Sequence, residues 1–161
     1  GKFIAAYFLI LRRKEVDEPI DYVIYMVTVA LGFAAAENAL FIANPLTQGL
    51  VLDSIVTGNL RFVGSTLLHI LSSTAVGVSM ALAFYKSRRS KRHYLVAGLI
   101  LAIALHTAFN LTIMVSGGRS GLVASSVVWV GVIVVLLLFE KVKKIHPVSD
   151  RPLEEIVSDG K

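Results

Sequence analysis

The 161-residue chain is 55% hydrophobic and has a mean hydropathy of +0.73, which is too apolar for a soluble domain of this length. It contains no cysteine, which excludes disulfides, thiolate catalysis and cysteine-type zinc sites. The formal net charge is +5, but the basic residues gather at the ends of apolar stretches, so a nucleic-acid surface is not expected.

Five apolar stretches follow one another along the chain, and all are predicted to be helical. The first, Phe3–Leu11, is too short to cross a bilayer and is interpreted as the end of a helix whose start is missing. The other four are long enough for a hydrocarbon core of about 30 Å. They are Ile20–Ala43, Phe62–Tyr85, Tyr94–Val115 and Leu122–Phe139. The predicted fold is an all-α polytopic transmembrane helix bundle, with four full spans plus a truncated N-terminal helix.

The charges between these stretches give one consistent topology under the positive-inside rule. Basic clusters precede the first full span, join the second span to the third, and follow the fourth. This pattern places Arg12–Pro19, Lys86–His93 and the C-terminus on the cytoplasmic side, and makes Asn44–Asn59 an external loop. Residues 1–139 are predicted to form a transmembrane helical domain, and residues 140–161 a short cytoplasmic tail.

Three ionisable residues lie inside three different predicted spans, and they are Glu37, His69 and His106. Charged residues such as Asp, Lys or Arg cost about 2.5–3.5 kcal/mol at the centre of an inserted helix, so three ionisable residues at similar depth indicate a site. Asn110 lies one helical turn beyond His106 on the same face. Counted from the outer helix ends at about 1.5 Å per residue, all four lie in the outer half of the membrane.

Small and hydroxyl-bearing residues surround these side chains at helical spacing. Small residues let helices approach closely, and hydroxyls satisfy polar partners inside a bilayer, so these faces are predicted to turn inward together. A purely structural polar network is the alternative that this pattern leaves open. The residues concerned are Gly32, Ala34, Ala35, Ala36, Ser65, Thr66, Ser72, Ser73, Gly77, Gly98 and Ala102.

The known ways of cutting a peptide inside a membrane can be tested by residue type. No His-Glu-x-x-His string is present, which excludes a zinc protease of that type. An aspartyl dyad fails because Asp21 lies at a helix mouth and Asp53 in a loop. Gly118–Gly121 matches a Gly-x-Ser-Gly pattern, but the histidine after it, His146, falls in the predicted tail. Ser116–Gly121 is therefore interpreted as a tight external turn.

Activation of water by a carboxylate is the mechanism that remains after these three protease types are set aside. Glu37 would act as the base, a histidine would protonate the leaving amine, and Asn110 or the second histidine would donate to the oxyanion. The alternative is a Zn²⁺ held by His69 and His106 with a carboxylate, which leaves a position for water. The residue types are compatible with both chemistries. A proton-coupled transporter, with Glu37 as the proton site, and a non-enzymatic membrane adaptor are the competing functions.

At these residues the chain resembles the PrsW family of intramembrane proteases, within the larger group of CAAX-processing and bacteriocin-processing enzymes. The resemblance runs from about Glu15 to Asn110 and depends on short motifs in a fixed order on successive spans. The motifs are Asp17-Glu-Pro-Ile-Asp21, Gly32-Phe-Ala-Ala-Ala-Glu-Asn38, Arg61 followed by His69, and His106-x-x-x-Asn110.

The resemblance implies an integral protein of the bacterial cytoplasmic membrane that cuts membrane-anchored proteins, such as anti-sigma factors, near the external side. It implies an active site lined by Glu37, Asn38, His69, His106 and Asn110. Zinc is the one cofactor to consider. The expected partners are a membrane protein substrate and the lipid bilayer, and no nucleic acid.

One motif of the family is incomplete in this sequence. The family carries a Glu-Glu-x-x-Lys motif on the helix just before this region, and the resemblance implies that its glutamate pair is catalytic. Lys2 matches the last residue of that motif, but the two glutamates are not in this chain. Glu15, Asp17 and Glu18 do not replace them, because they fall in a predicted cytoplasmic loop. We therefore expect either that the chain is truncated at its N-terminus or that the missing helix is supplied separately. The glutamate that activates water would come from the absent pair or be Glu37.

Overall fold

The computed structural model describes residues 1–115 and 121–145, and over these residues the chain is helical with short connections. This confirms the predicted all-α class. The elements, two of them π-helical turns (η), are α1 Lys2–Ala6, η1 Tyr7–Leu11, α2 Pro19–Thr47, α3 Val51–Arg61, η2 Phe62–Thr66, α4 Leu67–Leu82, α5 Arg88–Val115 and α6 Gly121–Lys143.

Several sequence-based predictions fall on residues that the structure does not describe. These are residues 116–120 of the predicted turn Ser116–Gly121 and residues 146–161 of the predicted tail, including His146. The side chain of Arg61 is also outside the description.

Three helical segments in the described part of the chain are long and apolar enough to cross a membrane. They are Pro19–Thr47, Gly64–Leu82 and Arg88–Leu111. These segments coincide with the first three predicted spans. The fourth predicted stretch, Leu122–Phe139, lies within α6, and its role as a full span stays a prediction.

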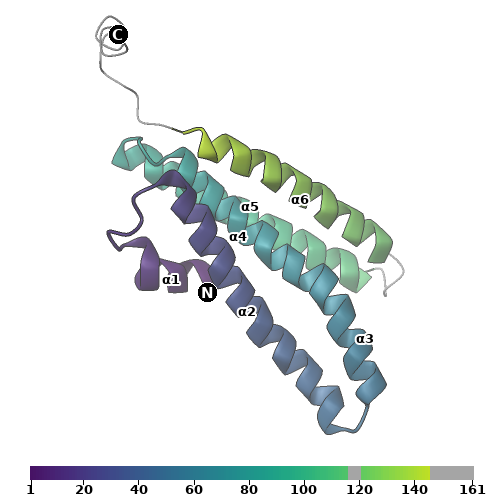
Figure 1. Ribbon diagram of the computed structural model, residues 1–161. Coiled ribbons are helices and arrows are strands. Elements are labelled where there is room, and N and C mark those ends of the chain that lie inside the picture. The colour runs from purple at the N-terminus through teal and green to yellow at the C-terminus, as the bar shows by residue number, and fades with distance from the viewer. Residues whose placement is uncertain (116–120, 146–161) are drawn as a thin grey trace, which may run out of the picture.

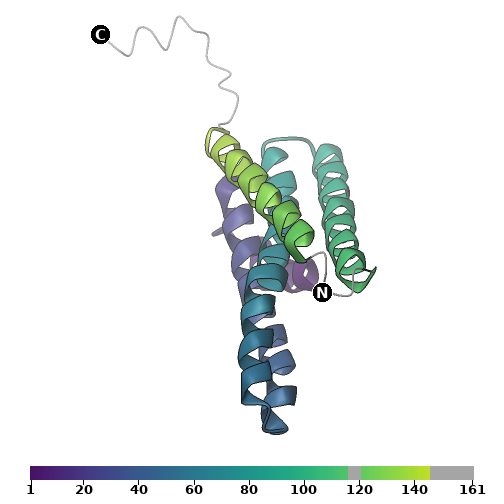
Figure 2. The ribbon, with the colours of Figure 1, turned by 90° about the vertical axis from the view of Figure 1, so that its right-hand side faces the viewer.

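α4 is the central helix of the bundle. It packs against α2, α5 and α6, and α1 lies across α2 and also touches α4 (Figures 1 and 2). Two glycines allow these close approaches. A Cβ on Gly77 would lie 2.7 Å from the Tyr22 carbonyl oxygen of α2, and a Cβ on Gly98 of α5 would lie 2.7 Å from Ser79 of α4. The small residues therefore bring α2 and α5 onto opposite sides of α4.

α2 begins at a well-formed cap. Glu18 is the N-cap residue and Pro19 occupies the first helical turn, where the missing N–H of proline is harmless. The Asp21 carboxylate accepts hydrogen bonds from the backbone N–H groups of Glu18 at 2.9 Å and Asp17 at 3.1 Å. Asp21 is therefore a capping residue at a helix mouth, as predicted.

The prediction that Asn44–Asn59 is a loop is wrong, and its external location stays a prediction. α2 continues to Thr47 and α3 begins at Val51, so residues 48–50 alone connect them, with Gly49 at a φ of 76°. Asp53 lies in the first turn of α3 and not in a loop. The polar residues of this segment suggested a loop, but an acidic side chain in a first turn is favourable to the helix dipole. Polar interruptions did not prevent helix formation here.

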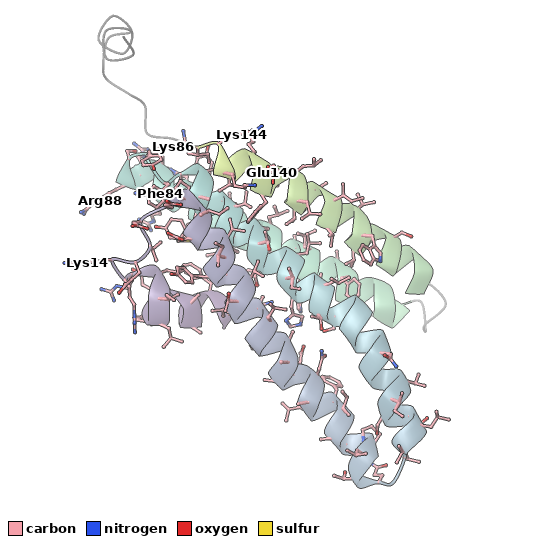
Figure 3. The ribbon with its side chains drawn as sticks, viewed as in Figure 1. Lys14, Phe84, Lys86, Arg88, Glu140 and Lys144 are labelled. Atoms are coloured by element: carbon pink, nitrogen blue, oxygen red, sulfur yellow. The ribbon has the colours of Figure 1, made fainter. Side chains whose placement is uncertain are left out.

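Most of the basic segment Lys86–His93, predicted as a loop, forms the first turns of α5. The Ser87 hydroxyl accepts a hydrogen bond from the Ser90 backbone N–H at 3.4 Å, which fits the start of a helix. Lys14, Lys86, Arg88 and Lys144 all lie at one end of the bundle (Figure 3). This clustering agrees with the predicted distribution of charge, and the cytoplasmic location of that end stays a prediction.

Candidate active site

Three helices bring Glu37, His69 and His106 together. Glu37 of α2, His69 of α4 and His106 of α5 line one cavity of about 440 Å³. The His69 Nε2 and the Glu37 Oε2 are 3.0 Å apart. The rings of His69 and His106 meet edge to face, with centroids 5.2 Å apart and an interplanar angle of 81°. The predicted convergence of the acid and both imidazoles is therefore present in the structure.

The face that α2 turns toward the bundle determines the direction of Glu37. The buried residues of this helix repeat every three or four positions, and the next position in the series is Glu37. The prediction that Gly32, Ala35 and Ala36 also turn inward is wrong, since all three are exposed and lie on other sides of the helix. The buried series is Val23, Met26, Ala30 and Ala34.

His69 is the buried centre of the site, with only 3% of its surface exposed. The ring of Phe33 stacks on it at a centroid distance of 5.5 Å, and His106 meets it from α5. Glu37 is more open, since 34% of its side chain is exposed. The Glu37 side chain therefore reaches the surface, although its Oε2, on the side of His69, is buried, whereas the His69 ring is held on all sides.

Lys2 is a member of this cluster that the sequence analysis did not include among the site residues. Its Nζ lies 3.2 Å from the Nδ1 of His69 and 3.5 Å from the Ser72 Oγ. It also lies 5.7 Å from the centroid of the Phe33 ring, within reach of a cation–π contact. A lone lysine at the start of an otherwise apolar helix is the signal that could have identified it.

The structure does not bring Asn110 to the cavity. Asn110 is exposed, whereas Ala102 and His106 of the same predicted stripe line the cavity. A step of four residues turns a helix about 40° past a full turn, so Asn110 lies about 120° around α5 from Gly98. Since Gly98 faces α4, the drift turns Asn110 away. The rule that residues four apart share a helix face therefore fails between Gly98 and Asn110, which are three such steps apart.

Asn38 does not line the cavity either, although it follows Glu37 directly. Its Nδ2 donates a hydrogen bond to the Thr66 Oγ1 at 2.9 Å. This bond ties α2 to the segment that enters α4, three residues before His69. Asn38 therefore connects the two helices whose acid and imidazole pair with each other.

The described residues around His69 do not form a three-ligand zinc group as they stand. Two imidazoles and a carboxylate are suitable ligand types. In residues 1–115 and 121–145, however, no three His, Cys, Asp or Glu side chains come together as a metal-binding group. The Lys2 ammonium also lies at one ring nitrogen of His69 and the Glu37 carboxylate at the other. Lys2 thus occupies the Nδ1 side of the His69 ring, and the Nε2 side faces Glu37.

Comparison with known proteins gives a consistent set of matches. The sequence matches PrsW-protease, the PrsW family intramembrane metalloprotease, over residues 1–139. It is 30% identical over 112 residues to "Protease PrsW" of Geobacillus kaustophilus (strain HTA426), which covers 68% of this chain and 44% of that protein. It is 29% identical over 107 residues to "Protease PrsW" of Clostridioides difficile (strain 630), which covers 66% and 43%.

A third relative, "Protease PrsW" of Halalkalibacterium halodurans, is 26% identical over 116 residues, which covers 70% of this chain and 48% of that protein. The chain thus spans less than half the length of these curated relatives. No solved structure matches it.

Proposed function

Since this chain belongs to the PrsW family of intramembrane metalloproteases, we propose that it carries part of the active site of a membrane-embedded endopeptidase. The observation that supports this most directly is the convergence of Glu37, His69 and His106 on one cavity from three different helices. The three apolar helices and the bacterial relatives make it an integral membrane protein. Its proposed location is the bacterial cytoplasmic membrane, with the C-terminus in the cytoplasm.

Glu37 is the proposed base. Its carboxylate takes a proton from water as the water oxygen bonds to the carbonyl carbon of the substrate. The imidazole of His69, 3.0 Å away, orients that carboxylate. The C–N bond then breaks, and the amine nitrogen takes a proton from an imidazole of the site. These steps use only residues of this chain, and none depends on a metal ion.

The cavity also supports a substrate class. Its polar wall, with Glu37 and the two histidines, continues into an apolar part formed by Met26, Val76 and Leu99. A peptide lying along this surface would place its scissile bond at the carboxylate and an apolar side chain beside Met26 and Val76. This lining fits a membrane-anchored protein substrate, and the membership of the PrsW family is the ground for proposing one of the anti-sigma-factor kind, cut near the external side. The substrate helix must unwind locally, since helical peptide bonds are shielded.

Cleavage of a membrane-anchored reporter in cells tests the proposal. The natural protein that contains this chain should process the reporter, and Glu37→Gln should reduce the rate by about 10²–10⁴-fold, the typical contribution of general acid–base catalysis. Glu140→Gln removes the same charge from an exposed position and is the matched control. Processing by Glu37→Gln at the rate of the unmodified protein would refute the assignment.

The same variants separate the competing function. Proton-coupled transport through Glu37 predicts a pH-dependent flux in liposomes that Glu37→Gln abolishes, with no reporter cleavage by either protein. The protease proposal predicts the reverse pattern.

A further inference from the structure

We propose that Lys2 holds His69 as the neutral tautomer with its proton on Nε2, and that His106 is therefore the imidazole that protonates the leaving amine. The first half concerns the hydrogen bonding of the site. The second half rests on the proposed protease function.

The tautomer follows from the inventory of donors and acceptors around the ring. An ammonium group has three donors and no acceptor. The Lys2 Nζ is 3.2 Å from the Nδ1 of His69, so Nδ1 accepts and carries no proton. A neutral imidazole then carries its proton on Nε2, the nitrogen that lies 3.0 Å from the Glu37 Oε2. Lys2 therefore faces the nitrogen that accepts, and the protonated nitrogen lies on the side of Glu37.

The charges around the ring favour the same state. Among the described residues, the titratable groups that face His69 are Lys2 from α1, Glu37 from α2 and His106 from α5. A proton added to Nδ1 would place a second positive charge 3.2 Å from the Lys2 ammonium. A neutral His69 ring instead lies between the Lys2 ammonium at Nδ1 and the Glu37 carboxylate at Nε2.

This arrangement gives the two histidines different tasks. Both ring nitrogens of His69 are engaged, and the side chain is buried, so it acts as a positioning residue for Glu37. His106 lines the same cavity and is only partly buried. For this step His106 starts as the imidazolium, and when the C–N bond breaks it gives one proton to the amine nitrogen and becomes neutral. The proton that Glu37 received from water then returns to His106 through solvent in the cavity.

Histidine ¹⁵N NMR of the purified protein tests the tautomer without any need for activity. The sequence has four histidines, and the background His93→Gln/His146→Gln leaves His69 and His106. We expect a one-bond N–H coupling at Nε2 of His69 and none at Nδ1. Lys2→Met should remove this preference and give a mixture of tautomers, whereas Lys2→Arg, which also donates without accepting, should keep it. A proton on Nδ1 in the natural sequence, or a spectrum that Lys2→Met leaves unchanged, would overturn the proposal.

Reporter cleavage tests the division of roles. His106→Gln should lose about 10²–10⁴-fold in rate, and Lys2→Met a smaller factor that Lys2→Arg restores. If no variant and no natural protein cleaves any reporter while the NMR result holds, the protease function fails and the tautomer assignment stands. If Lys2→Met cleaves at the natural rate with a changed tautomer, the positioning role is wrong.

A second inference rests on a different region, the outer face of α5. A surface groove of about 400 Å³ runs along this face. At the end nearest the start of α5 it is lined by three basic residues, Arg89, Arg92 and His93. One turn further along the same helix face, the groove becomes apolar, with Val96, Ala97 and Ile100. All six are exposed, because α5 packs on α4 through other positions, Leu95, Gly98 and Leu99 among them.

We infer that this groove binds an anionic phospholipid, with its phosphate at the two guanidinium groups and an acyl chain along the apolar part. Guanidinium groups match phosphate oxygens in geometry and charge. Within the described ranges, neither Arg89 nor Arg92 is paired with a carboxylate. The candidate span begins at Arg88, so the basic end lies at the level of the lipid headgroups. The order of charge and then apolar surface along one helix face is that of a phospholipid.

Thermal unfolding and native mass spectrometry of the purified protein test this binding. Dioleoyl-phosphatidylglycerol should raise the Tm and remain bound, and dioleoyl-phosphatidylcholine should do neither. Arg89→Gln/Arg92→Gln should weaken phosphatidylglycerol binding by about tenfold or more, the effect of losing charge-assisted hydrogen bonds. Lys141→Gln/Lys144→Gln, with the same change of charge at the end of α6, should keep it. Equal losses in both double variants, or equal protection by inorganic phosphate, would refute a phospholipid site.

Discussion

His69 and His106 meet across one cavity, but the helices that carry them differ in burial. In the apolar stretch of α4, 61% of the residues are buried, whereas in that of α5 the share is 6%. His69 is consequently fixed by neighbours from three other elements, while His106 projects from a helix with one packed face. The comparison shows that two identical side chains lining one cavity can differ in burial because their helices pack differently, and the different tasks that we propose for them depend on this difference. The following predictions test this contrast.

The largest effect is expected when each histidine is replaced by alanine. His69→Ala opens a cavity in α4 and leaves Lys2 and Glu37 facing each other without the ring, which should lower the free energy of unfolding by about 2–5 kcal/mol. His106→Ala on the exposed helix should change it by about 1 kcal/mol or less. Thermal or denaturant unfolding in detergent measures both. Equal losses would show that burial of the helix does not distinguish the two sites.

A glycine substitution tests the close packing of α4 itself. Gly77→Ala would place a Cβ 2.7 Å from the Tyr22 carbonyl oxygen and 2.9 Å from the Val23 Cα, and backbone atoms cannot move aside easily. We expect a loss of about 1–3 kcal/mol in unfolding free energy. Gly32→Ala of α2 meets nothing within 4 Å and is the matched control. It should be neutral or stabilising by up to about 1 kcal/mol, since alanine favours a helix.

Two asparagines test the same contrast, between a packed and an exposed helix position, at the level of a single hydrogen bond. Asn38→Ala removes the 2.9 Å bond to Thr66 and should lower the unfolding free energy by about 0.5–1.5 kcal/mol. Asn110→Ala, on the exposed side of α5, should leave it unchanged within about 0.5 kcal/mol. Unfolding curves recorded side by side compare the two. A larger loss for Asn110→Ala would mean that this side chain is packed against a partner.

The smallest effect is expected at the exposed end of α6. The hydrogen bond from Lys143, 2.9 Å away, holds the pKa of Glu140 below its usual range, just beyond the predicted fourth span. Any stabilisation from this pair is therefore present at neutral pH and is lost as the pH falls through that lowered pKa. Lys143→Ala should leave the Tm at pH 7 unchanged, because both side chains are exposed. A clear drop in Tm would contradict this.

Much of the site could be predicted because the bilayer limits what a sequence can contain. Ionisable side chains inside apolar stretches are rare, so Glu37, His69 and His106 were identifiable by type and position alone. Asn110 was misplaced because a spacing of four residues does not match the helical period, and the error grows along α5. Lys2 was not identified as a site residue, because its partners His69 and Ser72 are 67 and 70 residues away in the chain. Only the packing of α1 brings them together.

The α2–α3 hairpin has a consequence for the bilayer itself. A helix of 29 residues is about 43 Å long, whereas the hydrocarbon core is about 30 Å thick. Both views show that α2 and α3 extend together well past the ends of α5 and α6 (Figures 1 and 2). A helix longer than the hydrocarbon core either tilts within the bilayer or projects beyond it. The end of α2 beyond Glu37 carries Asn38, Asn44 and Thr47, so projection of the α2–α3 hairpin from the membrane would leave the carboxylate near the boundary between lipid and water.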